Sequence, residues 1–259
     1  GLQPIGVKYD DASRKVVCTL EQDDIMDGLN WLHKWYQDGI INPDANVVTD
    51  GGKGSIFGSA QGWPAAATTW AFNQGIEKYD LAQVFGPLYT TETIQGSMNA
   101  ISANSKYKTE ALKVLQLMNT DPKFRDMCAY GTEGNYMEYA EDGTVQKLRD
   151  DWNWPSYTQG TFFILSTQAD GDPDAWNQVK EQNESATAST CLGFALDVTN
   201  IQNEVANCNT VWDKYKNDLL TGASDPATAV PACIEELKAA GLDTVIEEAQ
   251  KQVDEFFAN

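Results

Sequence analysis

The clearest pattern in the chain is a run of apolar residues that recurs every three or four positions between residues 201 and 219. Such spacing places apolar side chains on one face of an α-helix. The face consists of Ile201, Val205, Cys208, Trp212, Tyr215 and Leu219. Glycine often ends a helix, and Gly222 follows closely. We therefore predict one long amphipathic helix that ends before Gly222.

Helical spacing or helix-start signals predict further helices on both sides of this one. They cover residues 19–39, 110–119, 121–131, 172–179, 234–241 and 246–256. The first has the capping-box pattern Thr19-x-x-Gln22 ahead of its apolar face and Gly39 behind it. Asp121-Pro122 is typical of an N-cap followed by proline in the first turn.

Strand signals are shorter. Residues 81–86, 97–103 and 193–198 have the composition of strands. The Asp142-Gly143 dipeptide lies between β-prone runs within residues 136–147, which predicts a hairpin. We therefore expect a mixed α/β first part and a mostly helical second part.

Charge and hydropathy narrow the range of partners. The chain contains 38 Asp and Glu against 18 Lys and Arg, for a formal net charge of −20. A surface of this sign repels nucleic acid and anionic lipid surfaces. The longest apolar runs, such as residues 162–165, are far shorter than a membrane span of about 18 residues. The chain begins at Gly1 without methionine or a targeting segment, so we expect a processed or trimmed chain.

The sequence offers few candidate residues for a metal site or for a nucleophilic active site. The five cysteines are widely spaced without a C-x-x-C pair, so we predict neither a disulfide framework nor a zinc site. The single histidine, His33, lies in the predicted helix 19–39, where we expect a surface or packing role. No G-x-S-x-G elbow occurs, and residues 51–55 lack the spacing of a phosphate-binding loop. We predict no cofactor and no metal.

One acidic run has the spacing of a calcium loop. Positions 1, 3, 5 and 12 of such a loop would be Asp170, Asp172, Asp174 and Glu181. Position 6, however, is Ala175 instead of the glycine that the turn needs, and Pro173 is typical of a helix start. We therefore favour a helix start over a calcium site.

Paired carboxylates leave a second class of function open. Glycoside hydrolysis needs an acid and a base or nucleophile about 5–10 Å apart. The nearest candidates cluster on the predicted hairpin and are Glu138, Glu141 and Asp142. Exposed charges on a hairpin need no catalytic role. A carbohydrate-active hydrolase is therefore the alternative prediction.

Aromatic residues are the other notable feature, with 8 Trp, 10 Tyr and 9 Phe. An aromatic ring can cover the apolar face of a sugar while polar side chains bind its hydroxyls. Helical spacing predicts core positions for Trp31, Trp35 and Trp212. Four others lie on Gly- and Pro-rich segments, where core packing and sugar binding are both open: Trp63, Trp70, Trp152 and Trp154.

Several short segments together resemble a known family. They are KWYQDGIINPDA at 34–45, YGTEGNY at 130–136, LGF at 192–194, AAGLD at 239–243 and QKQVD at 250–254. In this order they resemble the carboxy-terminal half of family 1 extracellular solute-binding lipoproteins, the substrate receptors of carbohydrate-type ABC importers in Gram-positive bacteria.

The resemblance implies part of an α/β fold of the type II periplasmic-binding-protein class, similar to maltose-binding proteins. In that fold two lobes are joined by hinge strands, and the ligand lies in the cleft between them. Residues 1–103 would hold a second-lobe segment and a hinge strand, and residues 104–259 a helix-rich C-terminal region. Since family members are nearly twice as long, the resemblance places most of the missing N-terminal lobe upstream of Gly1.

The resemblance also implies ligand-binding residues. Trp63 and Trp70 match a cleft loop, Asn99 matches a strand that crosses between lobes, and Tyr136 belongs to the 130–136 motif. Trp152 and Trp154 join them on their loop setting alone.

The leading prediction is therefore a receptor without catalytic activity. It would bind a sugar or oligosaccharide in the cleft and close by hinge motion, presenting itself to the permease subunits of an ABC importer. The resemblance implies an extracellular, cell-surface location with a lipid anchor outside this chain. A third possibility is an interaction module, in which the helical half offers an apolar face to a protein partner.

Overall fold

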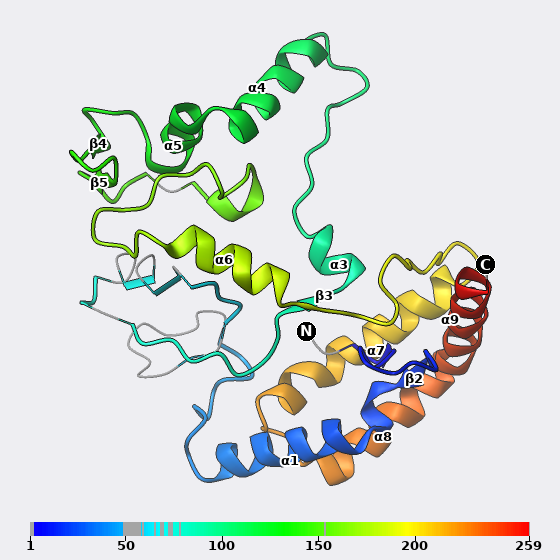
Figure 1. Ribbon diagram of the computed structural model, residues 1–259. Helices are drawn as coiled ribbons and strands as arrows, with labels where there is room; N and C mark the ends of the chain where they lie inside the picture. Colours follow the sequence, from blue (N-terminus) through cyan, green and yellow to red (C-terminus); the bar gives the residue numbers. More distant parts are fainter. Residues whose placement is uncertain are drawn as a thin grey trace. The chain divides into compact units, whose positions relative to one another are not determined.

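The computed structural model describes residues 3–48, 58, 60–64, 66–67, 70–71, 75–77, 79–152 and 154–258. The chain divides into two compact units, whose elements are labelled in Figure 1. The first unit contains Gly1–Gly52 and Ala188–Asn259, and the second contains Lys53–Thr187. The predicted division at residue 103 falls inside the second unit, and the assignment of the two parts to lobes stays a prediction.

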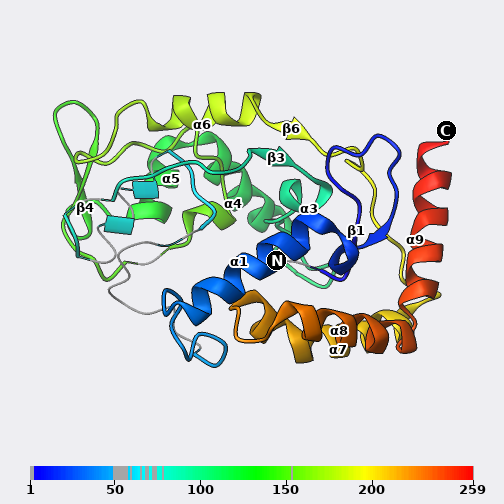
Figure 2. The same ribbon diagram turned by 90° about the horizontal axis from the view of Figure 1, so that it is seen from below.

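Four helices pack around the main core of the first unit: α1 (Asp23–Gln37), α7 (Gln202–Leu220), α8 (Pro226–Ala239) and α9 (Leu242–Phe257). The predicted helix over 201–219 is confirmed, because α7 buries Cys208, Trp212 and Leu219 in that core. α7 and α8 lie side by side (Figure 2). The helices predicted over 234–241 and 246–256 are confirmed as parts of α8 and α9.

The start of α1 differs from the prediction. Strands β1 (Ile5–Gly6) and β2 (Val17–Cys18) form an antiparallel pair, and the 3-10 helix η1 (Thr19–Glu21) follows. The predicted capping box is therefore wrong, since Thr19 lies inside η1 and α1 begins after Gln22. The Gln22 side chain donates to the carbonyl oxygen of Cys18 at 3.0 Å instead.

The end of α7 makes a close backbone contact with α1. Gly222 has a φ of +78°, and a Cβ atom added there would lie 2.2 Å from the carbonyl oxygen of Leu32. The Nδ1 atom of His33 lies 2.7 Å from the carbonyl oxygen of Gly222. The predicted packing role of His33 is thus confirmed, because its ring joins α1 to the end of α7.

The predicted core position is wrong for two of the three helical tryptophans. Trp212 is 3% exposed, whereas Trp31 is 57% and Trp35 42% exposed. Both exposed indoles line an apolar groove of about 630 Å³ on α1, together with Leu29 and Leu220. The spacing identified the apolar face of α1 correctly, but only part of that face is covered within the first unit.

The second unit consists of short elements joined by long loops. It contains β3 (Leu88–Tyr89), α3 (Thr91–Ile94), α4 (Lys108–Thr120), α5 (Pro122–Tyr130), β4 (Met137–Tyr139), β5 (Val145–Lys147), η2 (Ser156–Thr158) and α6 (Ala175–Glu184). The strand β6 (Thr187–Ala188) pairs with β3. The predicted helices over 110–119 and 121–131 are confirmed, and the side chain of Asp121 accepts from Phe124 N at the start of α5. The predicted hairpin is confirmed as β4 and β5.

The three predicted strands are wrong. Residues 81–86 and 97–103 form no strand, and the short strand β3 lies between them. Val84 is 91% exposed, so its β-prone segment finds no sheet to pack against. Residues 193–198 also form no strand, because Phe194 and Leu196 pack against α9 instead.

The acidic run at 170–181 supports a helix start. The carboxylate of Asp172 accepts from Asp174 N at 2.9 Å and from the Gln178 side chain at 2.7 Å. The helix α6 begins at Ala175, three residues after the predicted Asp172. Over the part of the chain that the structure describes, no group of three His, Cys, Asp or Glu side chains could hold a metal ion. No helix in that part is long and apolar enough to cross a membrane.

All five cysteines are free thiols: Cys18, Cys128, Cys191, Cys208 and Cys233. Burial raises the pKa of each, and that of Cys233 reaches about 11. Iodoacetamide at pH 8 should therefore modify the partly exposed Cys128 and Cys191 first, and the buried three only after unfolding. Mass spectrometry of native and urea-unfolded samples measures this. Equal labelling of native and unfolded Cys233 would contradict it.

Candidate functional site

A row of stacked aromatic side chains is the first candidate site, and it lies within the second unit. The Trp63 ring lies 6.0 Å from the Trp70 ring, edge to face, and 6.5 Å from Phe162 in a stacked arrangement. Phe162 stacks in turn on Trp176 at 4.9 Å. Tyr79 meets Trp70 edge to face at 6.4 Å. We call Tyr79, Trp70, Trp63, Phe162 and Trp176 the aromatic row.

Two buried charged residues of α5 hold the loop that carries Phe162. Arg125 is 0% and Asp126 1% exposed. The Arg125 side chain donates to the carbonyl oxygens of Thr161 at 3.0 Å and Ser156 at 2.8 Å, and its guanidinium lies 5.7 Å from the centre of the Phe162 ring. Burial lowers the pKa of this guanidinium. Arg125 therefore holds the loop in place and with it the position of Phe162.

Asp126 fixes the other end of the same loop. Its carboxylate accepts from Ser166 N at 2.9 Å, from Ser166 Oγ at 2.7 Å and from the Tyr139 hydroxyl at 2.9 Å. Burial and the bond to Asp126 raise the pKa of the Tyr139 phenol, which stays protonated and donates. Asp126 thereby joins α5, the loop and strand β4.

Several indole N–H groups lie buried in this unit. Those of Trp63, Trp154 and Trp176 have no acceptor among the residues that the structure describes. An unpaired buried donor costs about 1–3 kcal/mol, so such groups are concentrated where a structure serves a purpose other than stability.

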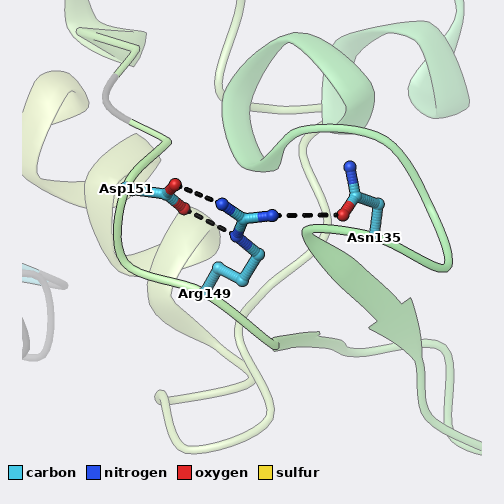
Figure 3. Close-up of polar contacts among 3 residues, drawn as sticks. All are labelled: Asn135, Arg149 and Asp151. Atoms are coloured by element: carbon cyan, nitrogen blue, oxygen red, sulfur yellow. Dashed lines mark hydrogen bonds and ion pairs between the residues drawn. The ribbon is translucent and has the colours of Figure 1, made fainter.

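A second group surrounds Tyr136. Its ring lies 5.2 Å from the Trp152 ring, and the Arg149 guanidinium lies 4.8 Å from its centre. Arg149 Nε donates to Asp151 Oδ1 at 2.8 Å and Arg149 Nη1 to Asn135 Oδ1 at 3.4 Å, while Nη2 bonds the second oxygen of Asp151 (Figure 3). We call Asn135, Tyr136, Arg149, Asp151 and Trp152 the Arg149 cluster.

Four of the six predicted ligand-binding residues fall into these two groups. Trp63 and Trp70 lie together in the aromatic row, and Tyr136 and Trp152 meet in the Arg149 cluster. Asn99 is exposed on a coil, and among the described residues no hydrogen bond joins its side chain to either group. Trp154 is partly buried, and no ring contact joins it to either group among the described residues. Its assignment, like the other five, stays a prediction.

Sequence reasoning missed the residues that position the rings. Phe162 was visible as part of an aromatic loop, but its stacking partners were not. Arg125 and Asp126 gave no signal, because adjacent residues of an amphipathic helix rarely both face the interior.

The carboxylates proposed for a hydrolase are on the hairpin surface. Glu138 and Glu141 are exposed. Asp142 accepts from Thr144 N at 3.0 Å and from Thr144 Oγ1 at 2.7 Å, and these bonds lower the pKa of its carboxyl. A carboxyl with a lowered pKa is ionised at neutral pH, so Asp142 is a poor general acid.

Comparison with known proteins identifies relatives of one kind. Residues 190–258 match the family model described as a domain of unknown function, DUF3502. Over 267 aligned residues, which include 99% of it, the chain is 26% identical to a carbohydrate ABC transporter substrate-binding protein of Streptococcus pneumoniae. It covers 54% of that protein, so it spans about half the length of this curated relative.

The solved structures give the same result. The chain matches the N-glycan transport solute binding protein NgtS of Streptococcus pneumoniae with a TM-score of 0.85 and 25% identity. The match covers 99% of this chain and 59% of that one. The NgtS complex with Man1GlcNAc matches with a TM-score of 0.84, also at 25% identity. The chain therefore has part of a solute-binding-protein fold, and its relatives are binding proteins, not enzymes.

Proposed function

We propose that this homologue of carbohydrate ABC transporter substrate-binding proteins binds a sugar or oligosaccharide non-covalently, in a cleft between two lobes. No bond is made or broken. The observation that carries the proposal is the aromatic row, since stacked rings on loops suit the apolar faces of sugar rings. The relative NgtS has been solved in complex with Man1GlcNAc and with Man5GlcNAc, which supports glycans as the ligand class.

The chemistry of binding follows from the residues of the second unit. Trp63 and Trp70 would stack on sugar rings, and indole N–H donors such as those of Trp63 and Trp154 would bond hydroxyl groups. Asn99, Tyr136 and Trp152 would complete the contacts. Closure then requires only that the ligand makes better contacts in the closed state than in the open one, which shifts the population of states.

The proposal includes the transport setting. The complete protein would face the cell exterior, tethered by a lipid anchor outside this chain, and would deliver the sugar to membrane permease subunits. A lobe beyond this chain would supply the opposite wall of the cleft. The coverage of about half of the relatives supports this part of the proposal.

Trp63→Ala is the direct test of the site. The complete protein, with the lobe proposed beyond this chain, should show a change in tryptophan fluorescence on titration with Man5GlcNAc. Loss of the stacking ring should raise the Kd about tenfold, which corresponds to about 1.4 kcal/mol.

Trp31→Ala is the matched control, because this exposed indole belongs to the first unit and is not part of the aromatic row. Its Kd should equal that of the parent chain. An equal Kd for Trp63→Ala would remove Trp63 from the site, and a complete protein that binds no glycan would refute the proposed function.

A further inference from the structure

The Arg149 cluster is held in place from three directions. A Cβ atom at Gly131 would lie 2.5 Å from the Tyr136 Cβ, so Tyr136 packs directly on the backbone at the end of α5. Trp152 Nε1 donates to the carbonyl oxygen of Cys128 at 3.1 Å. Asp151 binds Arg149 through two oxygens. The side chains therefore lose little freedom when a ligand binds, and such preorganisation favours affinity.

The cluster nevertheless leaves polar atoms in contact with solvent. The Arg149 and Asp151 side chains are 47% and 53% exposed, and Trp152 keeps part of its ring exposed. An exposed ion pair contributes little to stability, so these side chains can exchange contacts with a ligand at little cost to folding. A partly exposed ring beside a fixed donor and a fixed acceptor is the combination that a sugar ring with its hydroxyls needs.

The helix α5 positions both the aromatic row and the Arg149 cluster. Arg125 holds the loop of Phe162, and Cys128, one turn later on α5, holds Trp152. Residues three apart lie on one side of a helix, about 5 Å apart along its axis. The Arg149 cluster thus belongs to the same structural support as the aromatic row.

The local charge favours an uncharged ligand. Both carboxylate oxygens of Asp151 accept from Arg149, so this ion pair carries no net positive charge that would attract an anion. Arg149 already donates to Asp151 and Asn135, so an anionic ligand would have to replace one of these acceptors. The net charge of −20 adds to the repulsion.

We propose that the Arg149 cluster is a specificity subsite for a neutral sugar ring, in which the ring stacks on Trp152 while Arg149, Asp151 and Asn135 bind its hydroxyls. The subsite discriminates against glycans that carry a carboxylate. This inference rests on the proposed function and adds to it the residues and the charge class of the ligand.

The test compares Man5GlcNAc with a sialylated oligosaccharide on the complete protein, with the lobe proposed beyond this chain, by nitrogen-15 NMR titration. The Arg149 Nε–H and Trp152 indole signals should shift with Man5GlcNAc. Arg149→Met should raise the Kd for Man5GlcNAc about tenfold, because it removes charged donors. The sialylated glycan should bind the parent chain about fivefold more weakly, and Asp151→Asn should narrow this difference.

Lys216→Met is the matched control, since Lys216 and Asp213 form an exposed ion pair at 2.6 Å on α7. It should change neither Kd. The inference is overturned if Arg149→Met and Asp151→Asn lower the melting temperature but leave both Kd values unchanged. If Trp63→Ala still weakens binding in that case, the proposed function survives alone. If no glycan shifts any signal, both fail.

Discussion

Gly222→Ala is expected to destabilise the first unit by about 3 kcal/mol, in two ways that add. A φ of +78° costs an L-residue about 1–2 kcal/mol. The new Cβ would also lie 2.2 Å from the Leu32 carbonyl oxygen, and a backbone atom cannot turn aside as a side-chain end can. Separating α7 from α1 to relieve this contact disturbs the shared core, which costs a further 1–3 kcal/mol or so. Urea unfolding followed by far-ultraviolet circular dichroism measures the loss.

Gly39→Ala separates the two contributions. Gly39 also follows a helix of the first unit and has a φ of +74°, but a Cβ atom there would meet nothing within 4 Å. It should therefore lose only about 1 kcal/mol. Equal losses for the two variants would show that the contact with Leu32 carries no energetic weight.

Asp126→Ala is expected to cost the second unit about 3–5 kcal/mol. The change removes three hydrogen bonds at once and leaves the half-buried Ser166 N–H and Tyr139 hydroxyl without their acceptor. It also frees one end of the loop that carries Phe162. Thermal unfolding should shift, and near-ultraviolet circular dichroism of the stacked indoles should weaken in the folded state.

Two variants give the comparison. Asp126→Asn keeps an acceptor for Ser166 N–H and should lose less than half as much. Asp121→Ala removes only the N-cap bond to Phe124 N, worth about 1 kcal/mol. If Asp126→Ala lost no more than Asp121→Ala, the carboxylate would not be the anchor of the loop.

The helices of this protein could be predicted from its sequence because their signals are local. The spacing along α7 and the Asp121-Pro122 start of α5 depend only on residues a few positions apart. The hairpin at Asp142-Gly143 was predictable for the same reason, since Gly143 supplies the φ of +84° that the turn needs.

The strands outside the hairpin could not be predicted, because such a strand depends on a distant partner that sequence does not reveal. Phe194 and Leu196 have strand composition, yet α9 covers them, and no sheet does. The predictions for Trp31 and Trp35 were wrong for the opposite reason, because here a covering partner was expected and is missing among the described residues of the first unit. Their spacing is that of a buried face, but within the first unit part of that face stays exposed.

The candidate site was also predictable only in part. Aromatic residues on loops drew attention to Trp63 and Trp152, and the structure places each of them against other rings. The buried Arg125 and Asp126 were invisible, because their role depends on hydrogen bonds to residues about 30 to 40 positions away.

The discontinuity of the first unit has a consequence for the order of folding. On the ribosome, α1 emerges long before α7 and α8, which complete its core. The continuous second unit can fold as soon as its own residues have emerged, while Leu29 of α1 waits for the helices that bury it. At typical elongation rates this interval lasts roughly ten seconds or more, long enough for chaperones to bind. Synthesis from the N-terminus therefore makes α7, α8 and α9 the elements that complete the core of the first unit.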